Sequence, residues 1–456
     1  MAQKPSIPKG TRDFSPAEVL RRHYIISIIE KHFKQFGFQP IETPSFENNS
    51  TLLGKYGEEG DRLIFKILNS GEFLDKVDEE TYASRDSQKL GAAITEKALR
   101  YDLTVPFARY VVQHQNEIDF PFKRYQIQNV WRADRPQKGR FREFTQCDAD
   151  VVGSNGLIQE VELIQLYDAV FTELQLEGAT IKLNNRKLLA GIAEMIGAGA
   201  QLIPFTVALD KLDKIGRSGV EQEMRSKGIS DAAIEALSPL FTLSGSAKEK
   251  LNTLEDLLEN STKGQEGISE VRFILDAIEV LGLQSTTLDL DITLARGLDY
   301  YTGAIFEVAA PENVKMGSIG GGGRYDDLTG IFGLKDLGGV GISFGLDRIY
   351  LVLEELDLFP EQASARLKAL FINFGQEEAM QAMKALVRFR ESGIAAELYP
   401  DDAKLKKQFT YADRRDVPYV ILIGKDELAQ GMYTLKDMKS GEQQAMTLEE
   451  LLSRLR

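Results

Sequence analysis

The stretch Phe122–Gly153, FKRYQIQNVWRADRPQKGRFREFTQCDADVVG, decides the fold because its pattern is that of two strands joined by a basic loop. From Arg142 onward, polar side chains alternate with small or apolar ones, which is the two-residue period of a strand. Pro136 and Gly139 mark the connection between the two strands. The pattern therefore predicts a hairpin in which one face carries most of the polar side chains.

This hairpin concentrates positive charge in a chain of 456 residues whose formal net charge is -14. Residues 122–150 contain seven Lys or Arg and four Asp or Glu, a local excess of +3. Arginine forks fit phosphate oxygens, and a pair of carboxylates fits an ammonium group. The polar face therefore suits a nucleotide bound beside an amino acid, although an ordinary half-buried strand with a solvated face has the same pattern.

The composition is that of a globular protein, with 43% hydrophobic and 27% charged residues. The length predicts two to four domains. We expect a cytoplasmic protein with no membrane partner, because the N-terminal residues lack a signal-peptide pattern and no apolar run approaches the roughly 18 residues of a membrane span. One cysteine, Cys147, and three histidines argue against a Cys/His metal site. We therefore assign no protein ligand to a metal.

The pattern of predicted helices and strands changes three times along the chain. Helical segments interrupted by Gly, Ser and Pro fill 187–284 and predict an inserted helical domain. Strand patterns on both sides assign 1–186 and 285–360 to two parts of one core. Alternating strands and helices over 366–456 predict a separate domain with a mostly parallel sheet. The polar, aperiodic residues of Asn69–Lys97 predict a surface insertion.

Two polar segments of the second core part have alternative interpretations. Arg296 and the paired tyrosines that follow it, at the end of a buried strand, predict either a ligand pocket or a hydrogen-bonded corner. The glycine run in GSIGGGGRYDDL, residues 317–328, fits neither common phosphate-binding pattern. Glycines allow a ligand or another strand to approach closely, but on its own this run predicts a flexible turn.

Taken together, several stretches resemble the histidyl-tRNA synthetase family of class II aminoacyl-tRNA synthetases. They are GTRDF (10–14), WRADRPQKGRFREFTQCDAD (131–150), LARGLDYYTG (294–303), GGGGRYDDL (320–328) and GISFGLDRI (341–349). The resemblance covers almost the whole chain. It implies an α+β fold, in which the class II antiparallel sheet is flanked by helices and accompanied by a helical insertion domain and a C-terminal α/β anticodon-binding domain.

The resemblance also implies ATP-dependent attachment of L-histidine to tRNA(His) through a histidyl-adenylate, with release of pyrophosphate and AMP, by a homodimer that uses Mg²⁺. The implied ATP-binding residues are Arg132 at the α-phosphate, Asp134 and Phe144 at the adenine, Arg140 at the outer phosphates, and Arg348. The implied catalytic residues are Arg132 and Arg296, which would neutralise charge that develops on the α-phosphate.

The remaining implied roles concern histidine and tRNA. The histidine ammonium group would be bound by Asp102, Thr104, Gln146 and Asp150, and its imidazole by Tyr301 and Tyr325. The tRNA contacts would come from Gln137 in the hairpin loop and from Lys404, Lys406 and Lys407 in the C-terminal domain. Exposed lysines on a helix are also common as merely solvated side chains.

Two rival functions share this architecture. One is the non-catalytic regulatory subunit of ATP phosphoribosyltransferase, and the other is a module that senses uncharged tRNA beside a kinase domain. The regulatory subunits usually lack the C-terminal domain and lose the signature arginines and tyrosines, which are present here. No kinase signature accompanies the sequence. We therefore expect the protein to be the enzyme and neither of these two rivals.

Overall fold

The computed structural model describes residues 4–295, 300–360 and 367–456. The chain divides into two compact units, Met1–Phe359 and Pro360–Arg456. The predicted boundaries at 187, 285 and 366 are finer than this division and stay predictions. Among the described helices, none is long and apolar enough to cross a membrane.

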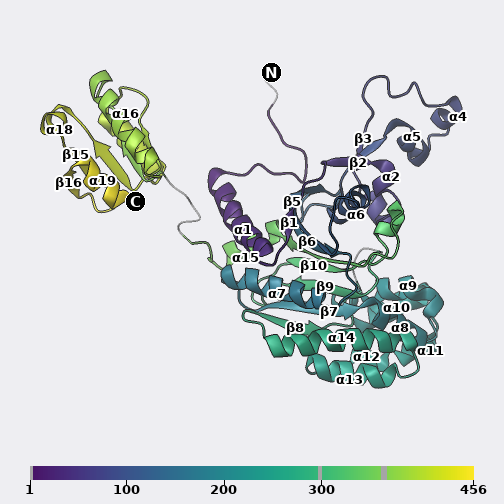
Figure 1. Cartoon of the computed structure of the whole chain (residues 1–456). Helices are drawn as coiled ribbons and strands as arrows, with labels where there is room; N and C mark the ends of the chain where they lie inside the picture. Colours follow the sequence, from purple (N-terminus) through teal and green to yellow (C-terminus); the bar gives the residue numbers. More distant parts are fainter. Residues whose placement is uncertain (1–3, 296–299, 361–366) are drawn as a thin grey trace. The chain divides into compact units, whose positions relative to one another are not determined.

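An eight-stranded sheet forms the centre of the first unit, in the order β1-β5-β6-β11-β10-β9-β7-β8 (Figure 1). Its strands are β1 (Gln39–Pro40), β5 (Phe122–Trp131), β6 (Glu143–Val152), β7 (Ala179–Asn185), β8 (Thr286–Leu290), β9 (Ala304–Ala309), β10 (Gly320–Arg324) and β11 (Gly339–Gly345). The pairs β1–β5 and β7–β8 are parallel, and the five pairs between β5 and β7 are antiparallel. The predicted α+β class with a largely antiparallel sheet is therefore confirmed.

The predicted hairpin is formed by β5 and β6, which pair in register from Phe122 opposite Val152 to Trp131 opposite Glu143. The small side chains of Cys147 and Ala149 point into the main core. The alternate residues of β6 lie on the other face, as the two-residue period predicts. Asp148 and Asp150 on this second face are buried and Phe144 and Gln146 are partly buried, so it is not the solvated face of an ordinary hairpin.

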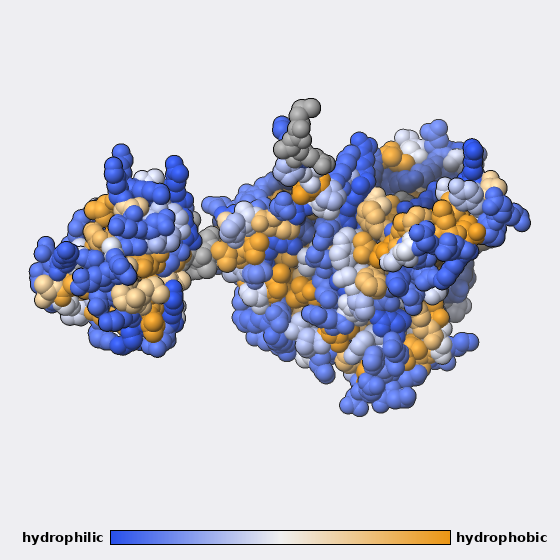
Figure 2. Space-filling model, turned by 90° about the horizontal axis from the view of Figure 1, so that it is seen from above, coloured by the Kyte–Doolittle hydropathy of each residue, from blue (hydrophilic) through white to orange (hydrophobic). Residues whose placement is uncertain are grey.

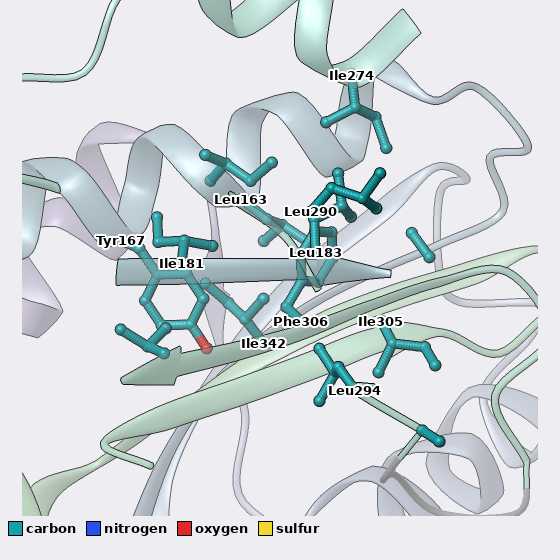
Figure 3. Close-up of a cluster of buried hydrophobic side chains, with 14 of the residues drawn as sticks. Leu163, Tyr167, Ile181, Leu183, Ile274, Leu290, Leu294, Ile305, Phe306 and Ile342 are labelled. Carbon is teal, nitrogen blue, oxygen red and sulfur yellow. The ribbon is translucent and has the colours of Figure 1, made fainter. Parts of the chain in front are cut away.

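Four long helices pack against the sheet and enclose one continuous core with it. They are α1 (Pro16–Gln35), α7 (Ile158–Glu173), α14 (Thr262–Leu281) and α15 (Leu346–Glu355). Helix α1 begins at a capping box, in which the Ser15 amide donates to Glu18 Oε2 at 2.7 Å and the Glu18 amide donates to Ser15 Oγ at 3.4 Å. Figure 3 shows Leu163 of α7 above Ile181 of β7, with the ring of Tyr167 extending down beside the same strand. Each such buried side chain contributes about 1.5–3 kcal/mol of transfer free energy.

The glycine run is a central strand, so the prediction of a flexible turn was wrong. Strand β10 lies between β9 and β11, with Gly322 opposite both Phe306 and Ile342. A Cβ atom on Gly322 would lie 2.1 Å from the carbonyl oxygen of Gly341, and one on Gly323 would lie 2.7 Å from that of Ala304. The glycines are needed for this close approach of neighbouring strands, which is the alternative that the sequence left open.

The chain between β1 and β5 forms several short elements. Helix α6 covers Thr104–Gln113. The segment Asn69–Lys97 contains α4 (Glu79–Ala83) and α5 (Ser87–Ile94), whose first turns are capped by preceding aspartates. Strands β2 (Phe46–Asn48), β4 (Lys97–Leu99) and β3 (Lys66–Ile67) form a small separate sheet, and the short helices α2 (Asn49–Leu52) and α3 (Gly57–Arg62) lie between β2 and β3 in the chain.

A run of helices connects the parallel neighbours β7 and β8, as the helical texture of this region predicts. They are α8 (Arg186–Met195), α9 (Leu202–Leu209), α10 (Leu212–Ser226), α11 (Asp231–Ala236), α12 (Ser238–Phe241), α13 (Ala247–Leu257) and α14. Parallel strands need such a crossover because a tight turn cannot join them. Figure 1 shows these helices gathered beside β7 and β8.

The second unit has a five-stranded sheet in the order β13-β12-β14-β15-β16. Its elements are β12 (Ala369–Phe371), α16 (Gln376–Glu391), β13 (Ala396–Leu398), α17 (Leu405–Arg414), β14 (Tyr419–Leu422), α18 (Lys425–Gln430), β15 (Tyr433–Asp437), β16 (Gln443–Met446) and α19 (Leu448–Leu455). Three strands are parallel, while β15 and β16 add antiparallel pairs, so the expectation of a mostly parallel sheet holds only for one side. On the face seen in Figure 2, hydrophobic residues form separate patches within a largely hydrophilic surface.

Candidate active site

The polar face of β6 forms the base of the candidate site. It carries Gln146, Asp148 and Asp150, and both aspartates are only 2% exposed. Asp150 accepts a hydrogen bond of 2.5 Å from the hydroxyl of Tyr325, and its other oxygen lies 2.7 Å from Nη2 of the fully buried Arg124. Burial raises the pKa of Asp150, whereas Arg124 and Tyr325 oppose this change. The structure thus brings together three residues that the sequence assigned to histidine: Gln146, Asp150 and Tyr325.

Asp148 belongs to the same face, although the sequence prediction omitted it. It lies opposite Ser343 of β11, and the side-chain amide of Gln146 lies 3.5 Å from its carboxylate. Burial raises the pKa of Asp148 to about 7, and the nearby charge of Asp150 adds to this effect, while Arg124 and Ser343 oppose it. The signal was present in the sequence, since Asp148 has the parity of its two assigned neighbours.

A third buried carboxylate in the site belongs to Asp102, which lies two residues before the start of α6. It accepts hydrogen bonds from the hydroxyl of Tyr56 at 2.8 Å, the hydroxyl of Tyr300 at 3.1 Å and the amide of Val105 at 3.2 Å. Burial raises the pKa of Asp102, and these donors lower it. Burial raises the pKa of Tyr300, and the side chain of Thr104 opposes this change. No pattern in the sequence pointed to Tyr56, which lies 46 residues from Asp102. Tyr300 is one of the paired tyrosines that predicted a ligand pocket or a hydrogen-bonded corner, but its partner Asp102 lies 198 residues away.

Three tyrosine rings line the space beside these carboxylates. The ring of Tyr300 lies 5.2 Å from that of Tyr301 and 6.0 Å from that of Tyr325, in edge-on arrangements. Burial raises the pKa of Tyr301, and the charges of Asp150 and Asp102 add to this effect. We call Asp102, Asp148 and Asp150 the acidic cluster. Arg124 forms an ion pair with Asp150, and a cluster of three buried carboxylates suits a ligand that carries a cationic group.

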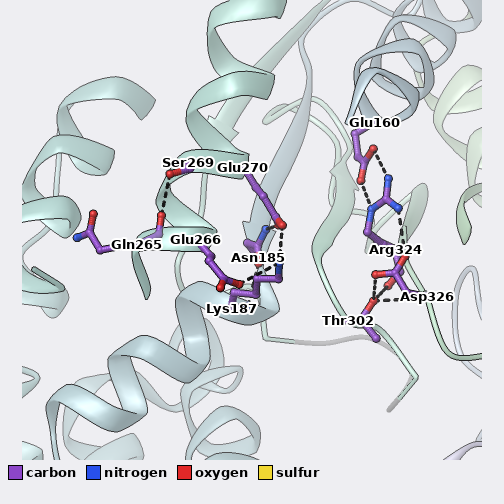
Figure 4. Close-up of polar contacts among 10 residues, drawn as sticks. All are labelled: Glu160, Asn185, Lys187, Gln265, Glu266, Ser269, Glu270, Thr302, Arg324 and Asp326. Carbon is purple, nitrogen blue, oxygen red and sulfur yellow. Dashed lines mark hydrogen bonds and ion pairs between the residues drawn. The ribbon is translucent and has the colours of Figure 1, made fainter. Parts of the chain in front are cut away.

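A buried ion pair supports the two segments that carry Tyr301 and Tyr325. Arg324 donates to both carboxylate oxygens of Glu160 on α7, from Nε at 2.6 Å and from Nη2 at 2.8 Å. Asp326 accepts from Nη1 of Arg324 at 3.1 Å and from the hydroxyl of Thr302 at 2.8 Å (Figure 4). The residues next to both tyrosines are therefore tied to one another and to α7.

Arginines gather at the other end of the hairpin. Arg132 donates from Nε to the carbonyl oxygen of Tyr101 at 3.0 Å, and its guanidinium lies 4.3 Å from the Tyr101 ring and 5.2 Å from the ring of Phe144. The charge of Arg132 also lowers the pKa of Asp102 against the larger effect of burial. Arg132 therefore stands between the acidic cluster and the hairpin loop.

Arg348 reaches the same loop from α15. It donates to the carbonyl oxygen of Gly139 at 2.9 Å and to that of Ser318 at 2.5 Å. Burial lowers the pKa of Arg348, and the charges of Arg140 and Arg132 lower it further. We call Arg132, Arg140 and Arg348 the arginine cluster. Because these cations disfavour one another's charge, an anionic ligand such as a polyphosphate would stabilise all three.

The remaining predicted residues lie in the hairpin loop, in the second unit or outside the described residues. Asp134 lies 3.8 Å from Arg140 across an ion pair in the loop. Gln137 is exposed at the loop tip, where its backbone pairs with that of Arg140. Arg296 lies outside the described residues. Lys404, Lys406 and Lys407 are exposed at the start of α17 in the second unit.

The family described as histidyl-tRNA synthetase matches residues 10–349. The chain belongs to the histidyl-tRNA synthetase family. The family described as anticodon binding domain matches residues 368–456, which confirms the predicted nature of the C-terminal domain.

Relatives of the family match over the full length. A histidine–tRNA ligase of Christiangramia forsetii is 69% identical over 456 residues, covering 100% of both chains. One of Flavobacterium johnsoniae is 63% identical over 469 aligned positions, covering 99% of both. A crystal structure of a histidyl-tRNA synthetase from a Nostoc species has a TM-score of 0.82 at 29% identity, covering 99% of this chain and 100% of that one.

Proposed function

We propose that this protein attaches L-histidine to tRNA(His) in two steps, with ATP as the second substrate. The observation that carries the proposal is that the acidic cluster and the arginine cluster adjoin at the β5–β6 hairpin, where Arg132 hydrogen-bonds to the residue before Asp102, in a chain of this family. A cationic amino acid at one cluster and a triphosphate at the other would place a carboxylate beside the α-phosphate. Holding the two reacting groups side by side supplies much of the rate enhancement of such reactions.

The acidic cluster would select histidine. Asp102, Thr104, Gln146 and Asp150 would hold its ammonium group, and Tyr301 and Tyr325 would read the imidazole nitrogens. A site whose buried polar groups need these nitrogens leaves the groups unpaired with an apolar rival, which costs the rival most of its affinity. Asp148 would add a negative charge to the same pocket above its pKa of about 7.

The arginine cluster would hold ATP, with Arg132 on the α-phosphate and Arg140 and Arg348 on the other phosphates. Phe144 would stack on the adenine, and Asp134 would accept a hydrogen bond from it. A carboxylate oxygen of histidine attacks the α-phosphorus, the bond to the pyrophosphate oxygen breaks, and pyrophosphate leaves. Arg132, together with Arg296, would neutralise the charge that develops on the α-phosphate.

We also propose that Mg²⁺ binds together with ATP and would neutralise part of the phosphate charge. Among the described residues, no group of three His, Cys, Asp or Glu side chains could hold a metal. Mg²⁺ in such sites usually takes most of its ligands from phosphates and water, so this arrangement fits it.

The second step would transfer histidine to the terminal ribose of tRNA(His). A ribose hydroxyl attacks the carbonyl carbon of the histidyl-adenylate, and AMP leaves with the electrons of the broken acyl–phosphate bond. Gln137 would touch the acceptor end, while Lys404, Lys406 and Lys407 would bind phosphates near the anticodon. We further propose a cytoplasmic homodimer.

The regulatory subunit of ATP phosphoribosyltransferase is not favoured as an alternative. The relatives named histidine–tRNA ligase cover the whole chain at 63–69% identity, including its anticodon-binding domain. The test is the exchange of labelled pyrophosphate into ATP. The proposal predicts exchange with histidine and not with the other amino acids; a folded protein with ATP, Mg²⁺ and histidine but no exchange would refute it.

A further inference from the structure

We infer that Arg12, in the N-terminal segment GTRDF, is a positioning residue for the ATP end of the site, where it holds the β5–β6 loop and the start of α15 in one arrangement. This inference rests on the proposed adenylation. The proposed function leaves GTRDF without a role, and the contacts of Arg12 supply one.

The first contact joins Arg12 to α15. Its Nη2 donates to Oδ1 of Asp347, the residue immediately before Arg348, and Arg22 of α1 donates to the same oxygen. The other oxygen of Asp347 accepts from the amide of Thr145 in β6 at 3.4 Å. Asp347 is 5% exposed, so its carboxylate is a buried junction of the N-terminal segment, α1, β6 and α15. The arginine that follows it on α15 belongs to the arginine cluster.

The second contact joins Arg12 to the hairpin loop. Its guanidinium carbon lies 3.6 Å from the centre of the Phe141 ring and 4.6 Å from that of Phe14. Phe141 follows Arg140, a member of the arginine cluster. A planar guanidinium stacks on an aromatic ring in a way that a lysine does not reproduce. Arg12 therefore contacts the loop through the ring of Phe141 and α15 through the carboxylate of Asp347.

The backbone next to Arg12 makes further contacts with the loop. The carbonyl oxygen of Gly10 accepts from the amide of Arg142 at 2.8 Å, and Arg142 in turn accepts from the amide of Arg132 at 2.9 Å. Gly10 has a φ of +88°, and a Cβ atom there would lie 2.8 Å from Arg142 and 2.9 Å from Pro136. The N-terminal segment thus lies directly against the loop, and only glycine fits at this point.

The contacts of Arg12 itself lead to Asp347, next to Arg348, and to Phe141, next to Arg140, and none of the contacts described above joins Arg12 directly to a residue of the acidic cluster. A positioning role therefore predicts a selective effect on ATP. A purely structural role predicts a general loss of stability that weakens both substrates alike. The two roles can be separated because histidine binding can be measured without ATP.

The chain offers a matched control in Arg21. Arg21 also joins α1 to α15, with Nη1 3.2 Å from Glu354 Oε1, and its guanidinium lies 5.0 Å from the ring of Phe359. It combines an ion pair with an aromatic contact, as Arg12 does, but both partners lie far along the chain from the hairpin loop. Loss of Arg21 tests whether any arginine that fastens α15 has the same effect.

The experiment compares Arg12→Ala, Arg12→Lys and Arg21→Ala in histidine-dependent pyrophosphate exchange, with histidine binding followed by equilibrium dialysis without ATP. For Arg12→Ala we expect kcat/KM for ATP to fall roughly tenfold to a hundredfold, because small misplacements of positioned groups cost up to about 10²-fold. Histidine affinity should change less than about twofold. Arg12→Lys should recover only part of the loss, and Arg21→Ala should match the parent protein.

Three outcomes would overturn the inference while the parent protein remains active: an unchanged kcat/KM for ATP, an equal loss in Arg21→Ala, or an equal loss of histidine affinity. Inactivity of the parent protein would instead refute the proposed function. If Arg12→Ala does not fold, Phe141→Leu is read by the same criteria, since it removes the ring and keeps the ion pair.

Discussion

The hydroxyl of Tyr325 donates to the carboxylate of Asp150 across 2.5 Å, which joins the residue after β10 to β6 on the inner face of the sheet. Gly341 of β11 lies opposite Asp150, and a Cβ atom there would lie 1.9 Å from the carboxylate. The tyrosine therefore fixes a buried carboxylate in a space that the intervening strand leaves open. This pair defines the floor of the proposed histidine pocket.

Removing the Tyr325 hydroxyl should weaken histidine selectively. In Tyr325→Phe, Asp150 loses a hydrogen bond, and the pocket loses a group proposed to read the imidazole. Hydrogen bonds to charged groups contribute about 1.5–3 kcal/mol, so KM for histidine should rise roughly tenfold to a hundredfold, with KM for ATP unchanged. Tyr350→Phe, which removes a hydroxyl 3.3 Å from Glu354 on α15, serves as the control. An unaltered KM for histidine would contradict the role of Tyr325.

The raised pKa of Asp148 predicts a specific dependence of stability on pH. The folded protein holds this proton up to a pKa of about 7, whereas an unperturbed aspartate releases it near 3.8. The folded state therefore binds more protons between these values, and the free energy of unfolding falls as the pH rises through them. Asp148→Asn removes the titrating group, so its stability relative to the parent should grow by more than about 1 kcal/mol from pH 4 to pH 8.

Trp131, the only tryptophan, allows this measurement to be made on the hairpin itself. Urea unfolding followed by its fluorescence gives the free energy at each pH. Asp119→Asn, at an exposed position, is the control. A difference between Asp148→Asn and the parent that does not vary with pH would show that Asp148 has an ordinary pKa.

Arg132 should contribute to the rate of adenylation more than to substrate binding. Arg132→Ala removes a cation from the proposed α-phosphate site, and loss of one such group typically costs about 10²–10³-fold in kcat. Pyrophosphate exchange should fall by this factor, while histidine affinity without ATP changes only a few-fold. Arg135→Ala, at an exposed loop position, should leave exchange intact. Exchange in Arg132→Ala at more than half of the parent rate would exclude Arg132 as a catalytic residue.

The C-terminal unit should serve tRNA rather than adenylation. It has its own buried cores, separate from that of the first unit, so truncation of 366–456 removes a compact body rather than part of the active site. Exchange should remain within about twofold of the parent, while charging falls roughly tenfold to a hundredfold because a second tRNA contact is lost. Charging at the full rate by the truncated protein would argue against an anticodon-binding role.

The hairpin shows how much of the site was accessible from sequence. The two-residue period placed Gln146 and Asp150 on one face, and the same period would have added Asp148. The arginines were recognisable because several of them occur in one short loop. Local patterns of this kind survive folding because they depend on neighbours in the chain.

Other features depended on partners distant in sequence. Tyr56 and Tyr300 became site residues only because the fold brings them to Asp102. The strand formed by Gly320–Arg324 goes against the low strand preference of glycine, and the close approach of β9 and β11 outweighs it. Arg12 belongs to the recognisable segment GTRDF, but its role could not be predicted locally because its partner Asp347 lies 335 residues away.

The most direct test of the central claim is aminoacylation of a tRNA(His) transcript with labelled histidine, ATP and Mg²⁺, measured beside a transcript of another tRNA. The account predicts acid-precipitable histidine on tRNA(His), none on the other tRNA, and none when ATP is withheld. Folded protein that leaves tRNA(His) uncharged, or that charges it with a different amino acid, would contradict the account.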